Sequence, residues 1–386
     1  MLSPLLDRIE VINVPAYLPV EKMNIAKNYL VPKFEEEYGF EEGHQSHEKV
    51  QLTDASIMEM VNKYCGHESG VRNLRKCIDR IFRKIVAKLE GQKAAVTEPE
   101  NVASADHNLV DDDGDLKEYQ VNTQNLEYFL DISPTDDTFY TNLNKQLPVG
   151  SSNGLAYVDD GYGAILKMQF VKKEYGLHKA KDEEEKAGSG SVTYTGRLGE
   201  VMKESLDVVK IAVFNYIQEN KLNDRFDKEA YHLHVPMGAT PKDGPSAGTS
   251  LFAALMSIAT NKPVGSNLAM TGEITTLGEV ISIGGVREKL TACKNHQVTR
   301  VILPLSNKKN VKKLPAEFKK GFTIFYVTNI DQLYNIAFNT SETQTNYTHL
   351  TDIGVEIDEF DKDSFMDEVL NHEQIREHNL INKLIQ

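Results

Sequence analysis

The sequence predicts a small all-α bundle at residues 19–92, followed by an α/β (α+β) domain at residues 120–340. Two observations support this division. In the first range, three segments carry apolar residues at spacings of three and four, which is typical of helices that bury one face. In the second range, short strand-like runs alternate with helical patterns. We expect residues 93–119 to form an acidic linker or insertion, and residues 341–386 a polar, acidic and loosely ordered tail.

Each of the three predicted helices in the first range has a recognisable start or apolar stripe. Pro19 opens the first, at a position where the N–H group that proline lacks would be unpaired in any case. Thr53 and Asp54 open the second, because short polar side chains accept hydrogen bonds from a helix start. The third has the longest stripe, made of Val71, Leu74, Ile78, Ile81, Ile85 and Leu89. Three such stripes bury one another most simply in a bundle.

The α/β range contains strands and helices that can be placed individually. Tyr231, Leu233 and Val235 alternate with two histidines, which indicates a half-buried strand. Periodicity is lost between about Gly91 and Lys117, and the polar stretch 178–191 is expected to be a surface loop. The remaining expected elements are a helix at 246–260, strands at 300–304 and 322–327, and a short helix at 330–338.

Composition narrows the functional class. The 386 residues are 40% hydrophobic and 26% charged, with a net charge of −14 that argues against nucleic-acid binding by the chain as a whole. No run approaches the roughly 18 apolar residues that a membrane span needs, so no membrane insertion is expected. The first residues resemble neither a secretory signal nor a transit peptide. The three cysteines lack metal-ligand spacing and are expected to be free thiols.

The densest cluster of special residues surrounds Ser246, in the stretch 236-PMGATPKDGPSAGTS-250. Glycines and prolines predict a tight loop that enters a helix at this serine. Unpaired N–H groups at a helix start can stabilise an oxyanion, and a serine there becomes a nucleophile if a base lies beside it. The alternative is that Ser246 only caps the helix, which is the commoner role of serine at such a position.

A second cluster, 284-GGVREKLTACKNH-296, places a lysine within an apolar stripe. In a helix, Lys289 shares a face with Val286, Leu290 and Cys293. Burial lowers the pKa of a lysine from about 10.4 towards neutrality and gives an amine that can accept a proton. The alternative is a lysine whose stem covers apolar surface while its ammonium stays in water.

Other catalytic or metal motifs are not met. The sequence has no GxxxxGK[ST] stretch for nucleotide phosphates. In 372-HEQIREH-378, Arg376 stands where a zinc protease has its second histidine. His232 and His234 share a strand face without further residues at ligand spacing, so a polar lining is favoured over a metal site.

Two longer stretches, 241-PKDGPSAG-248 and 270-MTGEITTLGEVISIGGVREKL-290, resemble the proteolytic domain of Lon proteases. That domain carries a PKDGPSAG serine loop, an MTGE(I/V) strand and a GG-x-(K/R)-E-K lysine helix in this order. Lys289 follows Ser246 by 43 residues and Thr271 follows it by 25, as in the family. The resemblance implies a Ser246–Lys289 catalytic dyad, with Thr271 orienting the lysine. It also implies supporting roles for Asp243, which shapes the loop, and for His232 and His234, which line the site.

The resemblance extends upstream. Residues 4-PLLDRIEVI-12 and 69-SGVRNLRKCIDRI-81 look like the end of a Lon AAA+ core (residues 1–18) and its helical lid (19–92). Arg8 matches an arginine finger that completes the ATP site of a neighbouring subunit, and Arg72 matches the sensor-2 arginine that contacts nucleotide. Arginine suits both roles because its guanidinium is always charged and binds phosphate oxygens in a fork. The alternatives are a surface salt bridge for Arg8 and an exposed helix charge for Arg72.

The resemblance implies an ATP-dependent serine endopeptidase that degrades unfolded or damaged proteins as a homo-hexamer in the mitochondrial matrix. Full-length members use ATP and Mg²⁺, but their ATPase core is missing here and peptide hydrolysis should need no cofactor. DNA binding is implied by resemblance only. The long acidic insertions, and 154-GLAYVDDGYG-163 where the family more often has Gly-Leu-Ala-Trp and a Gly-Gly pair, resemble the fungal mitochondrial branch. The alternative function is a non-catalytic or regulatory fragment that assembles with full-length subunits.

Overall fold

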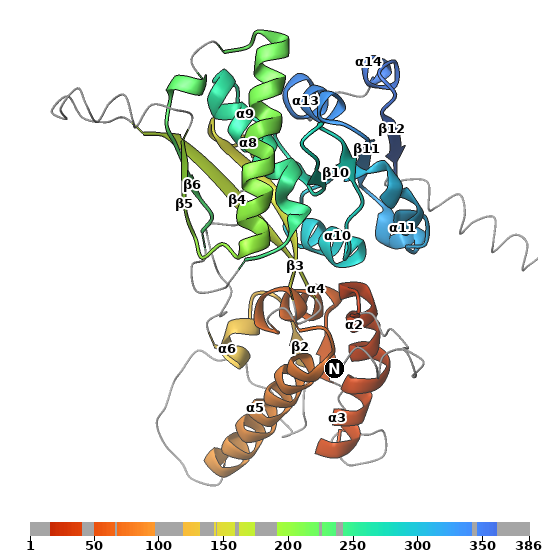
Figure 1. Cartoon of the computed structure of the whole chain (residues 1–386). Coiled ribbons are helices and arrows are strands. Elements are labelled where there is room, and N and C mark those ends of the chain that lie inside the picture. The colour runs from red at the N-terminus through yellow and green to blue at the C-terminus, as the bar shows by residue number, and fades with distance from the viewer. Residues whose placement is uncertain are drawn as a thin grey trace, which may run out of the picture. The chain divides into compact units, whose positions relative to one another are not determined.

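A computed structural model describes residues 16–40, 50–65, 68–96, 119–131, 143, 145–158, 162–173, 191–223, 226–236, 242–341 and 346–360 (Figure 1). The chain divides into two compact units. The first comprises residues 1–138 and 159–162, and the second comprises residues 139–158 and 163–386. Each unit has its own hydrophobic core.

The first unit is helical, as predicted. Its elements are α2 (Pro19–Ile25), the π-helical turn η1 (Ala26–Leu30), α3 (Val31–Tyr38), α4 (Asp54–Glu59), the π-helical turn η2 (Met60–Tyr64), α5 (Arg72–Val96) and α6 (Leu126–Leu130). The Thr53 side chain accepts a hydrogen bond from the backbone N–H of Ser56 and so caps α4 as expected. The carboxylate of Glu68 caps α5 by accepting from the N–H groups of Asn73 and Leu74. The sequence patterns therefore predicted the right helices for a local reason: each has its own capping residue or apolar stripe.

Two features of this unit differ from expectation. Helix α5 continues to Val96, past the loss of periodicity predicted from Gly91, because a single glycine weakens a helix without ending it. The short strands β1 (Val50–Leu52) and β2 (Tyr119–Val121) pair in parallel, although β2 was expected to open the second domain.

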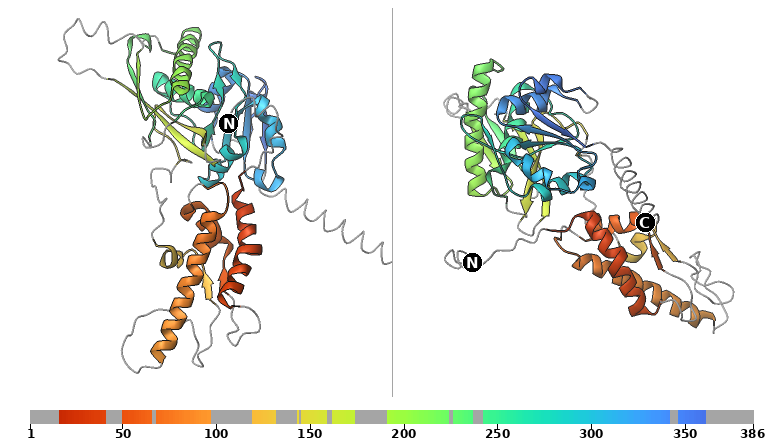
Figure 2. Two further views of the ribbon diagram at one scale, coloured as in Figure 1. Left: turned by 60° about the horizontal axis from the view of Figure 1, so that its bottom comes forward. Right: turned by 90° about the vertical axis from the view of Figure 1, so that its right-hand side faces the viewer.

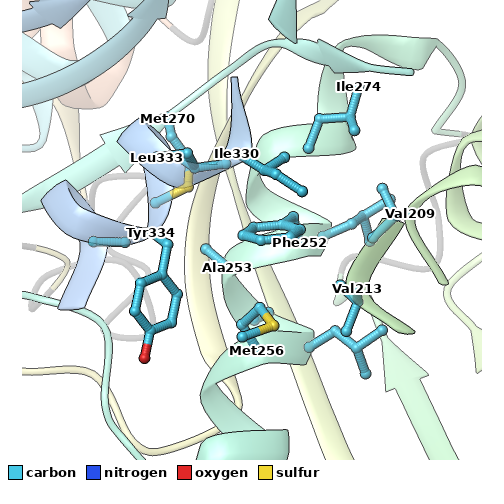
Figure 3. Packing of buried hydrophobic residues seen from close by; sticks show 14 of the residues in the cluster. Val209, Val213, Phe252, Ala253, Met256, Met270, Ile274, Ile330, Leu333 and Tyr334 are labelled. Carbon is cyan, nitrogen blue, oxygen red and sulfur yellow. The ribbon is translucent and has the colours of Figure 1, made fainter. Parts of the chain in front are cut away.

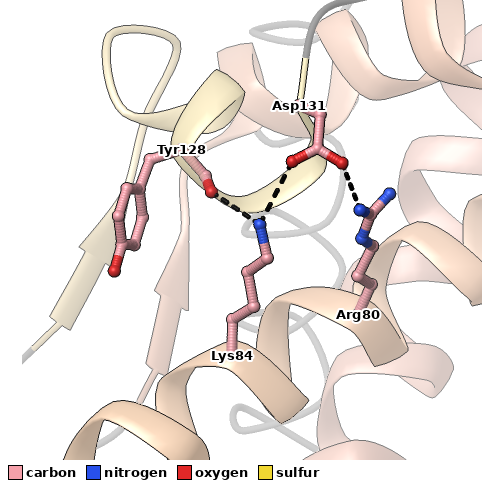
Figure 4. A network of polar contacts seen from close by, with 4 residues as sticks. All are labelled: Arg80, Lys84, Tyr128 and Asp131. Carbon is pink, nitrogen blue, oxygen red and sulfur yellow. Dashed lines mark hydrogen bonds and ion pairs between the residues drawn. The ribbon is translucent and has the colours of Figure 1, made fainter.

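Residues after β2 also pack on α5. Lys84 of α5 donates hydrogen bonds to the carbonyl of Tyr128 at 2.9 Å and to Asp131 at 3.3 Å, and Arg80 forms an ion pair with the same carboxylate (Figure 4). The described residues 119–131 therefore pack with the helices of the first unit.

The second unit is built on a mixed eight-stranded sheet in the order β12-β11-β10-β7-β3-β4-β6-β5. Parallel pairs join β7 to β3 and β10, β10 to β11, and β5 to β6, whereas β4–β6 and β11–β12 are antiparallel. A separate antiparallel pair is formed by β8 (Glu273–Ile274) and β9 (Val280–Ile281). The strands of the large sheet are β3 (Ser151–Val158), β4 (Tyr162–Lys172), β5 (Val192–Thr195), β6 (Tyr231–His234), β7 (Leu268–Met270), β10 (Arg300–Pro304), β11 (Thr323–Val327) and β12 (Glu356–Glu359). The predicted α/β class is confirmed.

The helices of this unit are α8 (Glu200–Asn220), α9 (Gly248–Thr260), α10 (Val286–Asn295), α11 (Lys308–Lys312), α12 (Ala316–Lys319), α13 (Ile330–Asn339) and α14 (Thr348–Thr351), with 3₁₀ turns η3 (Phe226–Lys228), η4 (Pro245–Ala247) and η5 (Leu305–Asn307). The long α8 lies along one side of the strands (Figure 2). Helix α9 is apolar around most of its circumference and is accordingly buried, with Phe252 lying among Val209 and Val213 of α8 and Ile330 of α13 (Figure 3). This surrounding core fixes the helix that follows Ser246.

The expectation of a loosely ordered tail beyond Asn339 is wrong for residues 346–360. Tyr347, Leu350 and Val355 are buried in the core of the sheet unit, and β12 adds an antiparallel edge strand to β11. The polar composition concealed these few apolar residues, which are enough to attach the segment.

Candidate active site

The loop before α9 is held by a carboxylate. Asp243 Oδ1 accepts hydrogen bonds from the N–H of Met202, in the first turn of α8, and from the N–H of Gly244, each at 3.0 Å. Gly244 has φ of +117°, a backbone conformation that disfavours any residue with a Cβ. The loop therefore enters the serine turn with its direction set by a capped helix on one side and a glycine on the other.

Ser246 lies in the 3₁₀ turn η4 and does not cap α9. The residue at the N-cap of α9 is Ala247, without a side-chain hydrogen bond, so the capping alternative is contradicted. The serine is partly accessible to solvent. Its backbone carbonyl accepts hydrogen bonds from the N–H of Gly272 at 3.0 Å and from Oγ1 of Thr271 at 3.1 Å.

Lys289 is buried in α10 and is only 1% exposed. Val286, Leu290 and Cys293 are buried beside it, so the predicted stripe is confirmed. Burial lowers the pKa of Lys289 to about 8 because the charged ammonium loses its hydration. The alternative of a lysine whose head stays in water is therefore contradicted.

Thr271 links the lysine to the serine loop. The Nζ of Lys289 donates a hydrogen bond to Thr271 Oγ1 at 3.0 Å, and that hydroxyl donates in turn to the carbonyl of Ser246. A hydroxyl has one proton, so Thr271 must accept from the amine. The lone pair of a neutral Lys289 is consequently not used by Thr271 and can accept a proton from another group.

Gly272 is a site residue that chemical reasoning on side chains does not single out. Besides its bond to Ser246, its carbonyl accepts from the N–H of Thr249. A Cβ at this position would lie 2.7 Å from Thr249 Cγ2 and 2.9 Å from Val280 Cγ1, so no side chain fits without a shift. The signal in the sequence is its place directly after Thr271.

The two histidines form part of a polar sheet face. His232 hydrogen-bonds Thr193 and Thr195 of β5, and His234 bonds Thr195 at 2.7 Å. Burial, followed by the charges of Lys173 and His234, lowers the pKa of His232. The strand expected at these residues is confirmed, whereas their role in lining the catalytic site stays a prediction.

The two candidate nucleotide-contacting arginines fall in the first unit. Arg72 is the first residue of α5 and is exposed. Arg8 lies outside the described residues, as do the segments 97–118, 174–190 and 372–378.

The described part of the chain contains no group of three or more His, Cys, Asp or Glu side chains placed to hold a metal ion. Among the same residues, no helix has both the length and the apolar character that a membrane crossing requires.

Comparison with known proteins identifies the domains. The family model for the Lon protease (S16) C-terminal proteolytic domain matches residues 120–340, and the model for the Lon protease AAA+ ATPase lid domain matches residues 41–97. The first match includes Ser246, Thr271 and Lys289, and the second includes Arg72.

Individual relatives agree. The chain is 36% identical over 340 residues to the Lon protease of Buchnera aphidicola subsp. Schizaphis graminum, an alignment covering 88% of this chain and 38% of the relative. It is 35% identical over 351 residues to the mitochondrial Lon protease homolog of Drosophila melanogaster, an alignment that covers 89% of this chain and 30% of the relative. It is 34% identical over 363 residues to the mitochondrial Lon protease homolog 1 of Arabidopsis thaliana, which covers 87% of this chain and 37% of the relative. The chain spans between 30% and 38% of the length of these three relatives. It belongs to the Lon protease family.

Proposed function

We propose that this chain is a serine endopeptidase in which Ser246 is the nucleophile and Lys289 the general base. The observation that carries the proposal is the buried amine of Lys289, which donates a hydrogen bond to Thr271 Oγ1, while that hydroxyl donates to the backbone carbonyl of Ser246. A serine hydroxyl is a weak nucleophile until a neighbouring base removes its proton. The site supplies such a base without a histidine.

In the proposed reaction, neutral Lys289 takes the hydroxyl proton of Ser246 while the serine oxygen attacks the scissile carbonyl carbon. The resulting tetrahedral intermediate collapses to an acyl-enzyme, and the protonated lysine gives its proton to the leaving amine. Lys289 then removes a proton from a water molecule, which attacks the ester carbonyl carbon. As the second product leaves, Lys289 returns that proton to the departing Ser246 oxygen, so the complete cycle restores a neutral lysine and a serine hydroxyl.

The pKa of Lys289 makes this reaction feasible near neutral pH. With a pKa of about 8, roughly a tenth of the amine is neutral at pH 7. With an ordinary value near 10.4, fewer than about one molecule in 1,000 would be neutral. Burial therefore increases the population of the active base by roughly 200-fold.

The oxyanion requires N–H donors beside the serine. Pro245 has no N–H, and the N–H of Gly244 is already bonded to Asp243. Among residues 244–246, the N–H of Ser246 is therefore the group that can donate to the oxyanion. We assign Asp243 the role of holding the loop in the conformation that presents it.

Hydrolysis of a short unstructured peptide without ATP tests the proposal. The parent chain should cleave the peptide, and Ser246→Ala or Lys289→Ala should each lower kcat/KM by roughly 1,000-fold or more. Circular dichroism of each variant controls for folding. Variants that cleave as fast as the parent would rule out the dyad. A parent that never cleaves would favour the alternative, a non-catalytic fragment that acts only with full-length subunits.

Functions of the longer relatives are further proposals. Arg72 suits contact with a nucleotide phosphate, because its exposed guanidinium stands at the start of α5. Hydrolysis of Mg²⁺-bound ATP would supply the energy for substrate unfolding, and the GxxxxGK[ST] segment that would bind its phosphates does not occur in this sequence. Degradation of damaged proteins, assembly into hexamers and DNA binding are carried over on the same basis. The mitochondrial location stays a prediction, since bacterial and mitochondrial relatives match about equally well.

A further inference from the structure

The start of β4 approaches the lysine helix unusually closely. A Cβ built on Gly163 would lie 1.9 Å from the carbonyl oxygen of Glu288, 2.4 Å from its carbonyl carbon and 2.9 Å from the backbone nitrogen of Lys289. These are backbone atoms of α10, which cannot rotate away as the end of a side chain could. Any residue other than glycine at position 163 therefore requires the strand and the helix to move apart.

The end of β3 contacts the same helix one turn earlier. Gly285 is the N-cap of α10 and has φ of +67°. A Cβ at Gly285 would lie 2.8–3.0 Å from Cδ2, Cβ and Cγ of Tyr157, so the tyrosine packs directly against the helix start. Tyr157 and Gly163 thus contact α10 at two points that flank its first turn.

The two contacts bear on catalysis because Lys289 follows this turn. We propose that Gly163 is a positioning residue for the dyad, with Tyr157 as its partner. Together they fix the distance between α10 and the sheet, and therefore the distance between Lys289 and Thr271. The inference rests on the proposed function. It assigns a role in the reaction to two residues outside the serine loop and the lysine helix.

The size of the expected effect follows from the distances. Ordinary Cβ contacts begin near 3.4 Å, so a methyl group on Gly163 requires a displacement of about 1.5 Å from the Glu288 carbonyl. The bond from Lys289 to Thr271 is 3.0 Å long and would not survive such a shift intact. A misplacement of about 1 Å in an active site commonly lowers the rate 100-fold.

The test compares Gly163→Ala with Gly284→Ala. Gly284 lies just before α10, has no positive φ and has open space where a Cβ would stand, so the same chemical change should fit there. We expect Gly163→Ala to lower kcat roughly 100-fold with KM unchanged, and Gly284→Ala to behave as the parent. Because the displaced amine becomes better hydrated, its pKa should rise, and the pH at half-maximal kcat/KM should therefore be higher than that of the parent.

A second variant keeps the inference testable if Gly163→Ala does not fold. Tyr157→Ala removes a contact without adding atoms, and should shift the pH midpoint in the same direction by a smaller amount. A merely destabilised protein would lose activity without this shift. If a folded Gly163→Ala, or Tyr157→Ala where the first does not fold, keeps the parent kcat and pH midpoint, the inference is wrong. Ser246→Ala, measured in parallel, distinguishes failure of this inference from failure of the proposed function. If Ser246→Ala is active, the proposed function itself is wrong.

Discussion

Replacing Lys289 by methionine should abolish peptide hydrolysis and yet stabilise the protein at pH 7. Methionine has nearly the length of lysine and no charge, so it can occupy the same space among Val286, Leu290 and Cys293. The parent must keep an ammonium in a position that is 1% exposed whenever Lys289 is protonated. The variant is free of that requirement.

The magnitude follows from the pKa shift. A fall from 10.5 to about 8 corresponds to about 3 kcal/mol that disfavours the charged form in the folded state. The variant also loses the hydrogen bond from Lys289 to Thr271, which contributes about 1 kcal/mol. We therefore expect Lys289→Met to raise the free energy of unfolding by roughly 2 kcal/mol at pH 7.

The pH dependence has a definite sign. Below pH 8 the lysine is protonated in both states, and the destabilisation of the folded parent is complete. Between about pH 8 and 10.5 the folded state has lost the proton while the unfolded state retains it, so the parent becomes more stable as pH rises. The advantage of the variant should therefore shrink from pH 7 to pH 10.5.

Urea unfolding at pH 7 and near pH 10 measures both effects. Because the chain has two units, hydrogen exchange of peptides from β10 and β11 should follow the sheet unit specifically. A variant that is less stable than the parent at pH 7, or a difference that does not change with pH, would refute the reasoning. Either result would mean that the lysine head remains hydrated.

Two further variants test the surroundings of Ser246 and Lys289. Thr271→Val should lower kcat roughly 10- to 100-fold by removing the acceptor for Lys289 and the donor to Ser246. Its matched control in kinetics is Thr249→Val, since the buried hydroxyl of Thr249 has no hydrogen-bond partner within the described structure. If the two valine variants behave alike, the linking role of Thr271 is wrong. Asp243→Ala should lower the free energy of unfolding by about 1 kcal/mol in urea, through loss of the cap on α8, and should reduce kcat, whereas Asp243→Asn keeps an accepting oxygen and should be milder.

The sequence predicted elements whose signals are local. The helix after Ser246, the strands near 300 and 322, and the capped helix after Thr53 each carry their own periodicity or capping residue, and all are present. The pairing of β1 with β2 was missed because each strand has only three residues and the two strands are far apart in sequence. No local pattern encodes such a contact.

The candidate site illustrates the same limit. A lysine in an apolar stripe is compatible with a buried base and with a snorkelling surface residue. What decides between them is the burial of Lys289 in the fold, where the ends of β3 and β4, more than 100 residues away in sequence, approach α10. The fold shows that Lys289 is buried, and its role as a base stays a prediction.

The segment 346–360 tests the one expectation that its polar composition made wrong, namely that it is a loosely ordered tail. Leu350 is fully buried, although it lies in a stretch expected to be a loosely ordered tail. Leu350→Ala should lower the free energy of unfolding of the sheet unit by roughly 2–5 kcal/mol, because it leaves a cavity in a packed core. The neighbouring Asp352 is exposed, so Asp352→Ala should stay within about 0.5 kcal/mol of the parent in the same urea titration. Equal stabilities for the two variants would mean that this segment does not pack on the core in solution. A large loss confined to Leu350→Ala would show instead that Tyr347, Leu350 and Val355 make these 15 residues an integral part of the domain that holds Ser246 and Lys289.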